Sequence, residues 1–257
     1  MTPEPPGVMT PEPPGAGRAG AGETARMSTV ERPGAQEWVP GAGSRDDVVD
    51  RVEEVDAAAA VAGLRAAAAA CRGCELWEPA TQVVFSAGNP RGRVVLVGEQ
   101  PGDVEDTQGI PFVGPAGRLL QQALDAAGLQ RQDLYVTNAV KHFRFERKGT
   151  RRIHQTPELA HMVACRPWLE AELAAVDPRV LVLLGATAAK TLLGGGFRVT
   201  KERGVLGPRD TTAGRFDVLP TVHPSSILRG PPESRDEAFA ALVADLAVVT
   251  AHLAGGG

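Results

Sequence analysis

Arg93-Val-Val-Leu-Val-Gly-Glu-Gln-Pro-Gly-Asp103 is the stretch of the chain that decides the fold. Residues 94–97 form a continuous apolar run, which is typical of a strand covered on both faces of its sheet. A turn rich in glycine and proline follows at once and carries polar side chains. The stretch therefore predicts a buried strand that ends in chemically capable residues.

Further apolar runs and helical patterns alternate along the chain. The β-like runs lie at residues 93–97, 134–137, 180–184 and 218–222, and the helical patterns at residues 57–70, 117–127, 157–176, 186–193 and 235–253. Alternation of this kind indicates a mostly parallel sheet with helices on both faces. We expect an α/β fold of three layers around a central four-stranded, mostly parallel sheet.

The composition limits the kinds of partner. The formal net charge is −4, so the protein has no overall electrostatic attraction for DNA, and a nucleic-acid site has to be local. Three cysteines, an odd number, argue against a disulfide scaffold. No uninterrupted apolar run of about 18 residues and no secretory signal pattern is present. We expect a cytoplasmic monomer without membrane contact.

Two regions differ in composition. Residues 1–55 are rich in Pro, Glu and Gly and repeat one motif, Met1 to Gly7 returning as Met9 to Gly15. Such a segment buries too little apolar surface to offset chain entropy, so we predict a disordered tail. Residues 56–257 are predicted to form the folded domain.

Polar residues follow three of the predicted strands directly. Glu99 follows the first strand, Asn138 the second and His223 the last. Open α/β sheets bind ligands at the carboxyl ends of their strands, so these side chains are expected to share one crevice. Two of them also have a plainer interpretation: Glu99 can belong to a tight turn, and His223 can be a structural histidine. In the functional interpretation, His223 donates to developing negative charge and Asn138 hydrogen-bonds a base edge.

One basic segment, residues 141–154, directly follows Asn138. Basic residues interleaved with Phe143 and Phe145 can contact phosphates and stack on bases. The alternative is a solvated loop, but its position beside the predicted crevice favours a function.

The pair Cys71-x2-Cys74 suits zinc, iron–sulfur and redox chemistry alike, and the further candidates His142 and Cys165 lie far downstream. From the residues alone, a metal or cluster site and plain buried thiols both remain open.

Taken together, five motifs resemble the iron–sulfur uracil-DNA glycosylases of family 4. They are Gly98-Glu-Gln-Pro-Gly-Asp-x-Glu-Asp106, Gly109-x-Pro-Phe-Val-Gly-Pro-Ala-Gly117, Thr137-Asn-Ala-Val-Lys141, Cys165-Arg-Pro-Trp-Leu169 and His223-Pro-Ser-Ser226. Two departures, Gln100 where family 4 usually has Ala and the insert Arg151-Arg-Ile-His154, resemble the UdgX-type subgroup. Thr150 stands where that subgroup usually has Lys.

The resemblance implies a role for each matching residue. His154 would attack the deoxyribose after uracil leaves and stay bonded to the DNA. Glu99 would support the oxocarbenium-like sugar or activate His154, and His223 would stabilise negative charge on the departing base. The substrate-binding set would be Gln100, Asp103, Phe112 and Asn138. The DNA-binding set would be Lys141, Arg151, Arg152 and Ser225. A [4Fe-4S] cluster would be held by Cys71, Cys74, His142 and Cys165.

The expected function is therefore DNA repair: excision of uracil from DNA, preferably single-stranded, followed by covalent capture through His154. Two alternatives remain. One is an ordinary family 4 glycosylase that turns over and releases abasic DNA. The other is a non-catalytic iron–sulfur protein that only senses nucleic acid.

Overall fold

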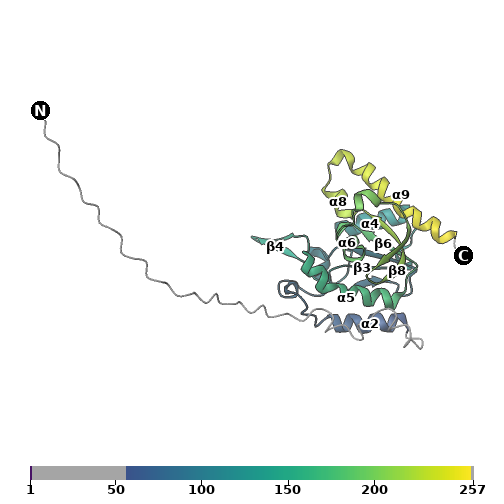
Figure 1. Cartoon of the computed structure of the whole chain (residues 1–257), viewed down its shortest axis with the longest axis horizontal. Coiled ribbons are helices and arrows are strands. Elements are labelled where there is room, and N and C mark those ends of the chain that lie inside the picture. Colours follow the sequence, from purple (N-terminus) through teal and green to yellow (C-terminus); the bar gives the residue numbers. More distant parts are fainter. Residues whose placement is uncertain (2–55, 256–257) are drawn as a thin grey trace. The chain divides into compact units, whose positions relative to one another are not determined.

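A mixed sheet forms the centre of the protein (Figure 1). The computed structural model describes Met1 and residues 56–255, and within them this sheet has six strands in the order β1-β3-β2-β6-β8-β7. The strands are β1 (Ser86–Gly88), β2 (Val94–Gly98), β3 (Leu134–Asn138), β6 (Val180–Leu184), β7 (Gly207–Thr211) and β8 (Gly214–Thr221). The four inner strands are parallel, as predicted, and β1 and β7 add antiparallel edges.

Helices cover both faces of this sheet. They are α2 (Ala57–Ala68), α3 (Asp103–Gln108), α4 (Pro115–Ala126), α5 (Leu159–Val176), α6 (Ala186–Leu193), α7 (Val199–Glu202), α8 (Pro224–Arg229) and α9 (Arg235–Ala254). Short 3-10 turns lie at Glu75–Trp77, Arg131–Asp133 and Pro232–Ser234. The five predicted helices correspond to α2, α4, α5, α6 and α9, so the expected three-layer α/β class is confirmed.

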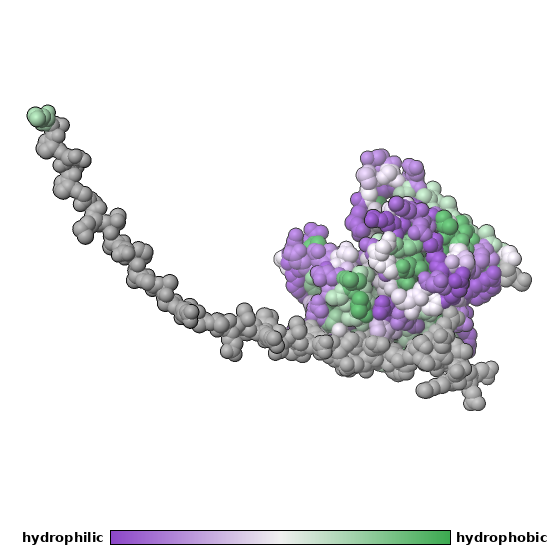
Figure 2. Space-filling view, in the orientation of Figure 1, coloured by the Kyte–Doolittle hydropathy of each residue, from purple (hydrophilic) through white to green (hydrophobic). Residues whose placement is uncertain are grey.

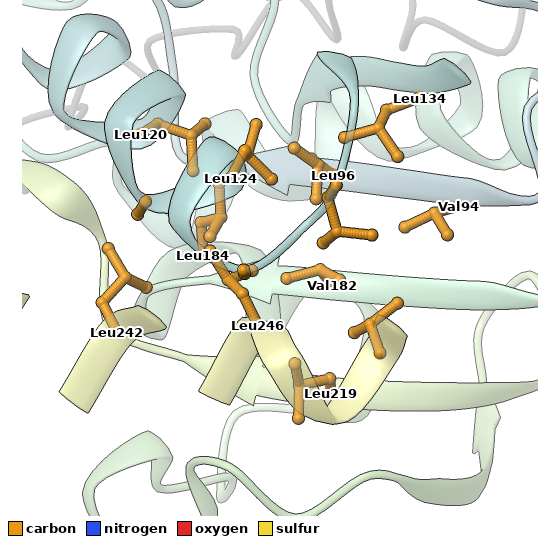
Figure 3. Close-up of a cluster of buried hydrophobic side chains, with 14 of the residues drawn as sticks. Val94, Leu96, Leu120, Leu124, Leu134, Val182, Leu184, Leu219, Leu242 and Leu246 are labelled. Carbon is orange, nitrogen blue, oxygen red and sulfur yellow. The ribbon is translucent and has the colours of Figure 1, made fainter. Parts of the chain in front are cut away.

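Alternate residues of each inner strand point to opposite faces, because side chains alternate along a strand. Val94 and Leu96 of β2 pack with α4 and α9 in one buried cluster, shown in Figure 3. Val95 and Val97 of the same strand pack with α5 and α6 in a second buried cluster on the opposite face. Burial on both faces explains why the apolar run of β2 is continuous.

Much of the basic segment, residues 141–154, forms a two-stranded hairpin. It consists of β4 (Phe145–Lys148) and β5 (Arg151–His154), which pair antiparallel with Phe145 opposite His154. Gly149 at its tip has φ of 61°, a left-handed conformation that favours glycine in a tight turn. The hairpin projects from the body of the protein, and its surface is hydrophilic (Figures 1 and 2).

Residues 232–254 form the one described helical stretch with the length and hydropathy of a membrane-crossing helix. Leu242, Leu246 and Val249 of α9 are fully buried against the sheet, so we interpret α9 as a core helix. The predicted tail, residues 1–55, lies outside the described residues apart from Met1.

Candidate active site at the carboxyl ends of the strands

Glu99, Asn138 and His223 lie together at the carboxyl edge of the sheet, as predicted. Glu99 directly follows β2, Asn138 ends β3 opposite Gly98, and His223 follows β8. Gly98 forms a close contact with this group: a Cβ placed there would lie 2.3 Å from Asn138 Oδ1 and 2.5 Å from Phe112 Cζ. Glycine at position 98 is therefore required for the amide and the phenyl ring to lie side by side.

Asn138 and Phe112 place an amide and a phenyl ring side by side, next to His223. Asn138 is 2% exposed, yet its Oδ1 has no hydrogen-bond partner among the described residues. An orphaned buried acceptor costs free energy unless a ligand N–H satisfies it. The buried Phe112 ring lies 5.8 Å from the His223 ring, centroid to centroid. Phe112 has φ of 57°, unusual for a bulky residue and typical of functional sites.

His223 is arranged as a neutral hydrogen-bond donor. Its Nδ1 accepts from the Ser225 backbone N–H at 3.2 Å and lies 2.8 Å from Ser225 Oγ, which places the ring proton on Nε2. Burial lowers the pKa of His223 to about 4, with smaller contributions from Arg229 and His154. Ser225, predicted to bind DNA, is thus placed where it fixes the tautomer of His223.

His154 lies beside Glu99, at the end of β5. Its Nε2 is 3.4 Å from Glu99 Oε1 and 3.0 Å from Gln100 Nε2. Burial lowers the pKa of His154, against the raising effect of the Glu99 charge, so the imidazole is neutral at pH 7. The side chain is still 41% exposed and therefore accessible to a ligand.

Gln100 fixes the hairpin that carries His154 at its root, formed by Arg144 and Gln155, the residues that flank β4 and β5. Its buried amide nitrogen donates to the carbonyl oxygens of Arg144, at 3.1 Å, and Gln155, at 2.9 Å. Its Oε1 accepts from the Arg144 backbone N–H at 3.0 Å. An amide has two N–H donors, so both are used by the hairpin backbone. Gln100 therefore lies beside His154, and its polar atoms bind the hairpin backbone; the predicted contact with substrate stays a prediction.

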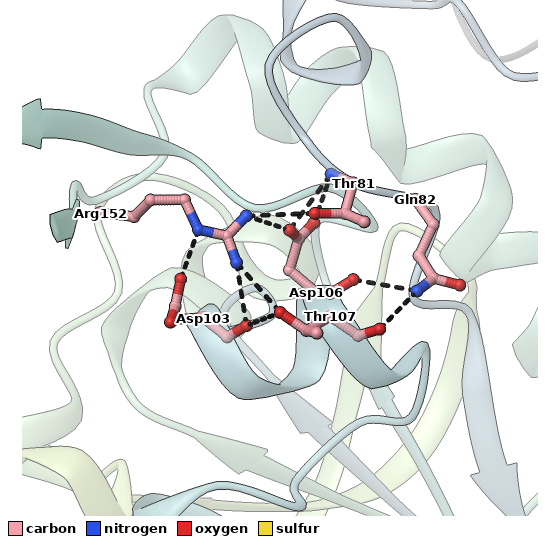
Figure 4. A network of polar contacts seen from close by, with 6 residues as sticks. All are labelled: Thr81, Gln82, Asp103, Asp106, Thr107 and Arg152. Atoms are coloured by element: carbon pink, nitrogen blue, oxygen red, sulfur yellow. Dashed lines mark hydrogen bonds and ion pairs between the residues drawn. The ribbon is translucent and has the colours of Figure 1, made fainter. Parts of the chain in front are cut away.

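A polar network attaches the hairpin to α3 (Figure 4). The Arg152 guanidinium pairs with Asp103 and, at 2.5 Å, with Asp106, which has no exposed surface. Thr81 and Thr107 complete the network. Asp103 and Arg152 were predicted to contact substrate and DNA, but the structure pairs them with one another. Arg151, on the other face of β5, is exposed.

The prediction that Lys141 binds DNA is wrong. Lys141 is 1% exposed, because it turns under the end of β3 and forms an ion pair with the buried Glu172. Its ammonium group also donates to Thr137 Oγ1 and, at 3.0 Å, to the Asn138 carbonyl oxygen. A buried lysine of this kind braces the backbone of Asn138 and cannot reach a phosphate.

Sequence reasoning missed two residues of the site. Thr187, the second residue of α6, donates its hydroxyl proton to Glu99 Oε2. Arg229, the last residue of α8, places a positive charge close enough to lower the pKa values of both His154 and His223. Both lie on helices that directly follow strands of the sheet, which is the only signal that the sequence offers for them.

The three cysteines pack in one apolar cluster between α2 and α5. Cys71 Sγ accepts from Trp168 Nε1 at 3.3 Å, and Cys165 Sγ accepts from the Lys141 backbone N–H at 3.2 Å. Burial raises the pKa of the Cys165 thiol to about 12. Burial also lowers the pKa of His142 to about 4, which leaves its imidazole neutral. In residues 56–255, no three potential ligands converge as a single metal ion requires.

Comparisons with known proteins identify the family. A model of the uracil DNA glycosylase superfamily matches residues 85–247. The chain is 41% identical over 160 residues to the type-4 uracil-DNA glycosylase of Thermotoga maritima, covering 62% of this chain and 78% of that protein. It is 35% identical over 166 residues to the type-4 enzyme of Sulfurisphaera tokodaii, covering 63% and 72%. The chain belongs to the uracil DNA glycosylase superfamily.

Membership confirms the expected family, fold class and enzyme class, a hydrolase of N-glycosidic bonds. The matched residues include Glu99, Asn138 and His223. Membership of the UdgX-type subgroup, which was predicted from Gln100 and the insert that ends at His154, stays a prediction.

Proposed function

We propose that this protein excises uracil from DNA and then bonds covalently to the resulting deoxyribose through His154. Relatives named type-4 uracil-DNA glycosylase support the excision. The observation that carries the capture step is the 3.4 Å separation between His154 Nε2 and Glu99 Oε1, at the edge of the sheet where Asn138 and Phe112 also lie.

Base recognition depends on Asn138 and Phe112. A target base has to leave the stack, at a cost of a few kcal/mol. Stacking on Phe112 offsets part of this cost. Asn138 Oδ1, without a partner in the described structure, accepts from the N3–H of uracil while the amide N–H donates to a uracil oxygen. Cytosine has no N3–H, so it leaves this acceptor unsatisfied.

Bond cleavage separates charge. The C1′–N1 bond breaks and its electron pair leaves with uracil. The neutral His223 donates from Nε2 to the uracil oxygen on which negative charge develops. The Glu99 carboxylate stabilises the cationic sugar from the other side.

Capture completes the reaction without an external reagent. The lone pair of a neutral His154 ring nitrogen forms a bond to C1′, and the other ring nitrogen loses its proton to solvent. The departing uracil anion takes up one proton. Gln100 cannot act as a general base, so water attack has no activating group at that position.

The hairpin is the proposed DNA contact. Arg147, Lys148 and Arg151 are exposed near its tip, beside Phe145. These charges attract phosphates, and the ring offers a stacking surface, which favours a single-stranded substrate.

We further propose that Cys71, Cys74, His142 and Cys165 hold a [4Fe-4S] cluster. The three thiols share one apolar cluster, two of their sulfurs accept N–H hydrogen bonds, and the neutral His142 ring has a nitrogen lone pair that can bind iron. Such surroundings suit a cluster, whose ligands spread around several irons. When bound, the cluster would join α2 to α5 and to the segment after β3; the excision step does not involve it.

The decisive experiment is a denaturing gel of the protein after incubation with uracil-containing single-stranded DNA. We expect a protein–DNA adduct with wild type and none with His154→Ala, which still releases uracil because Glu99 and His223 remain. Multiple turnovers without adduct would support an ordinary glycosylase. Binding without any base release would support a non-catalytic sensor.

A further inference from the structure

Thr187 occupies a defined position behind Glu99. It follows Gly185 and Ala186 at the turn from β6 into α6, where Gly185 has φ of 92°. A Cβ at Gly185 would lie 2.9 Å from His223 Cβ, so this glycine lets α6 begin directly against the site. The buried Thr187 hydroxyl then donates to Glu99 Oε2.

The two oxygens of Glu99 thus face different partners. Oε2 accepts from Thr187, and Oε1 faces His154 Nε2 at 3.4 Å. The terminal torsion of a glutamate has broad, nearly two-fold preferences, so a free carboxylate rotates readily. The Thr187 hydroxyl, fixed on a helix, holds the carboxylate in the orientation that points Oε1 at His154.

We propose that Thr187 is a positioning residue that aims Glu99 at His154 and thereby sets the division of product between covalent capture and free abasic DNA. The inference rests on the proposed capture by His154. A misaimed carboxylate still lies beside the cationic sugar, so uracil departs. It no longer orients the imidazole, and water competes more successfully for C1′.

Thr191 provides a matched control on the same helix. It lies one turn later, is also buried, and its hydroxyl donates to the Thr187 carbonyl oxygen at 2.8 Å instead of to Glu99. Replacing either threonine by valine removes one hydroxyl from the same face of α6. Only the Thr187 change removes a hydrogen bond to Glu99.

The test measures adduct and free abasic product together in single-turnover reactions with uracil-containing single-stranded DNA. We expect Thr187→Val to lower the adduct-to-free-product ratio about tenfold, since a hydrogen bond to a charged group is lost. Thr187→Ser should restore the ratio to within about twofold, and Thr191→Val should leave it unchanged. Uracil release should persist in all three variants.

The outcomes separate this inference from the proposed function. If wild type forms no adduct, capture itself fails and the inference with it. If wild type forms adduct and Thr187→Val does so in the same ratio, only the role of Thr187 is overturned. Equal loss in Thr187→Ser and Thr187→Val would also overturn it, because packing would then explain the effect. Thr187→Ala replaces the valine variant if the latter does not fold.

Discussion

The Gln100 amide nitrogen donates to the main-chain carbonyl oxygen of Gln155, the residue immediately after His154, over 2.9 Å. The same amide also bonds to Arg144 on the opposite side of the hairpin root. One side chain that follows β2 therefore fixes both ends of the segment that presents His154 to Glu99.

Gln100→Ala should consequently lower the rate of adduct formation about tenfold, because the lost hydrogen bonds no longer fix the hairpin root. Uracil release should change much less, since Asn138, Phe112 and His223 do not depend on the hairpin. Single-turnover gels that resolve adduct and abasic product measure both rates. Gln121→Ala is the control, since the Gln121 amide donates within α4, to Asp125. An unchanged adduct rate would contradict the assignment.

Sequence patterns predicted the parts of the fold that depend on local chemistry. The continuous apolar runs gave β2 and β6, and the polar residues at the strand ends converge as expected. Two features were not predicted from the sequence. The β4–β5 hairpin has a charged, non-alternating sequence, and its stability comes from contacts such as Arg152 with Asp106, 46 positions away. Lys141 was predicted to lie on the surface, because its ion-pair partner Glu172 is distant in the sequence and no local pattern connects the two residues.

The adjacent residues Arg151 and Arg152 should respond differently to alanine substitution. Arg151→Ala should weaken DNA binding across sequences and reduce the salt dependence of binding by about one phosphate contact, since Arg151 is exposed. Arg152→Ala should leave that slope unchanged and lower the free energy of unfolding by about 2 kcal/mol, because the charge-assisted hydrogen bond to the buried Asp106 is lost. Salt titrations of DNA binding and denaturant unfolding separate the two effects. If both variants bind DNA with the same salt dependence, Arg151 does not contact a phosphate.

Lys141→Met should lower the free energy of unfolding by about 3–5 kcal/mol, since it leaves the buried Glu172 charge without its ion-pair partner. Adding Glu172→Gln should recover most of that loss, because the amide is neutral and its oxygen still accepts from Tyr135. Urea unfolding of both variants checks the expectation. A double variant no more stable than Lys141→Met would show that the ion pair is not the source of the loss.

Capture should depend on pH through His154. The neutral imidazole is the nucleophile, and burial lowers its pKa from 6.5. The adduct rate should therefore be constant around pH 7 to 8 and fall only as the pH drops below about 6.5. Because Glu99 and Arg229 also face the ring, the profile is measured in parallel on uracil release by His154→Ala. A half-maximal adduct rate above pH 6.5 would contradict a lowered pKa.

The cysteine site gives a prediction that needs no activity measurement. Protein purified without oxygen should contain about four iron atoms and four sulfides per chain and absorb visible light. Cys165→Ser should lose most of this iron, because its sulfur belongs to the apolar cluster that also contains Cys71 and Cys74. His142→Cys should retain it, since a thiolate binds iron at least as well as imidazole does. Iron analysis and the visible spectrum distinguish these outcomes, and wild-type protein without iron or sulfide would leave the three cysteines as packed thiols.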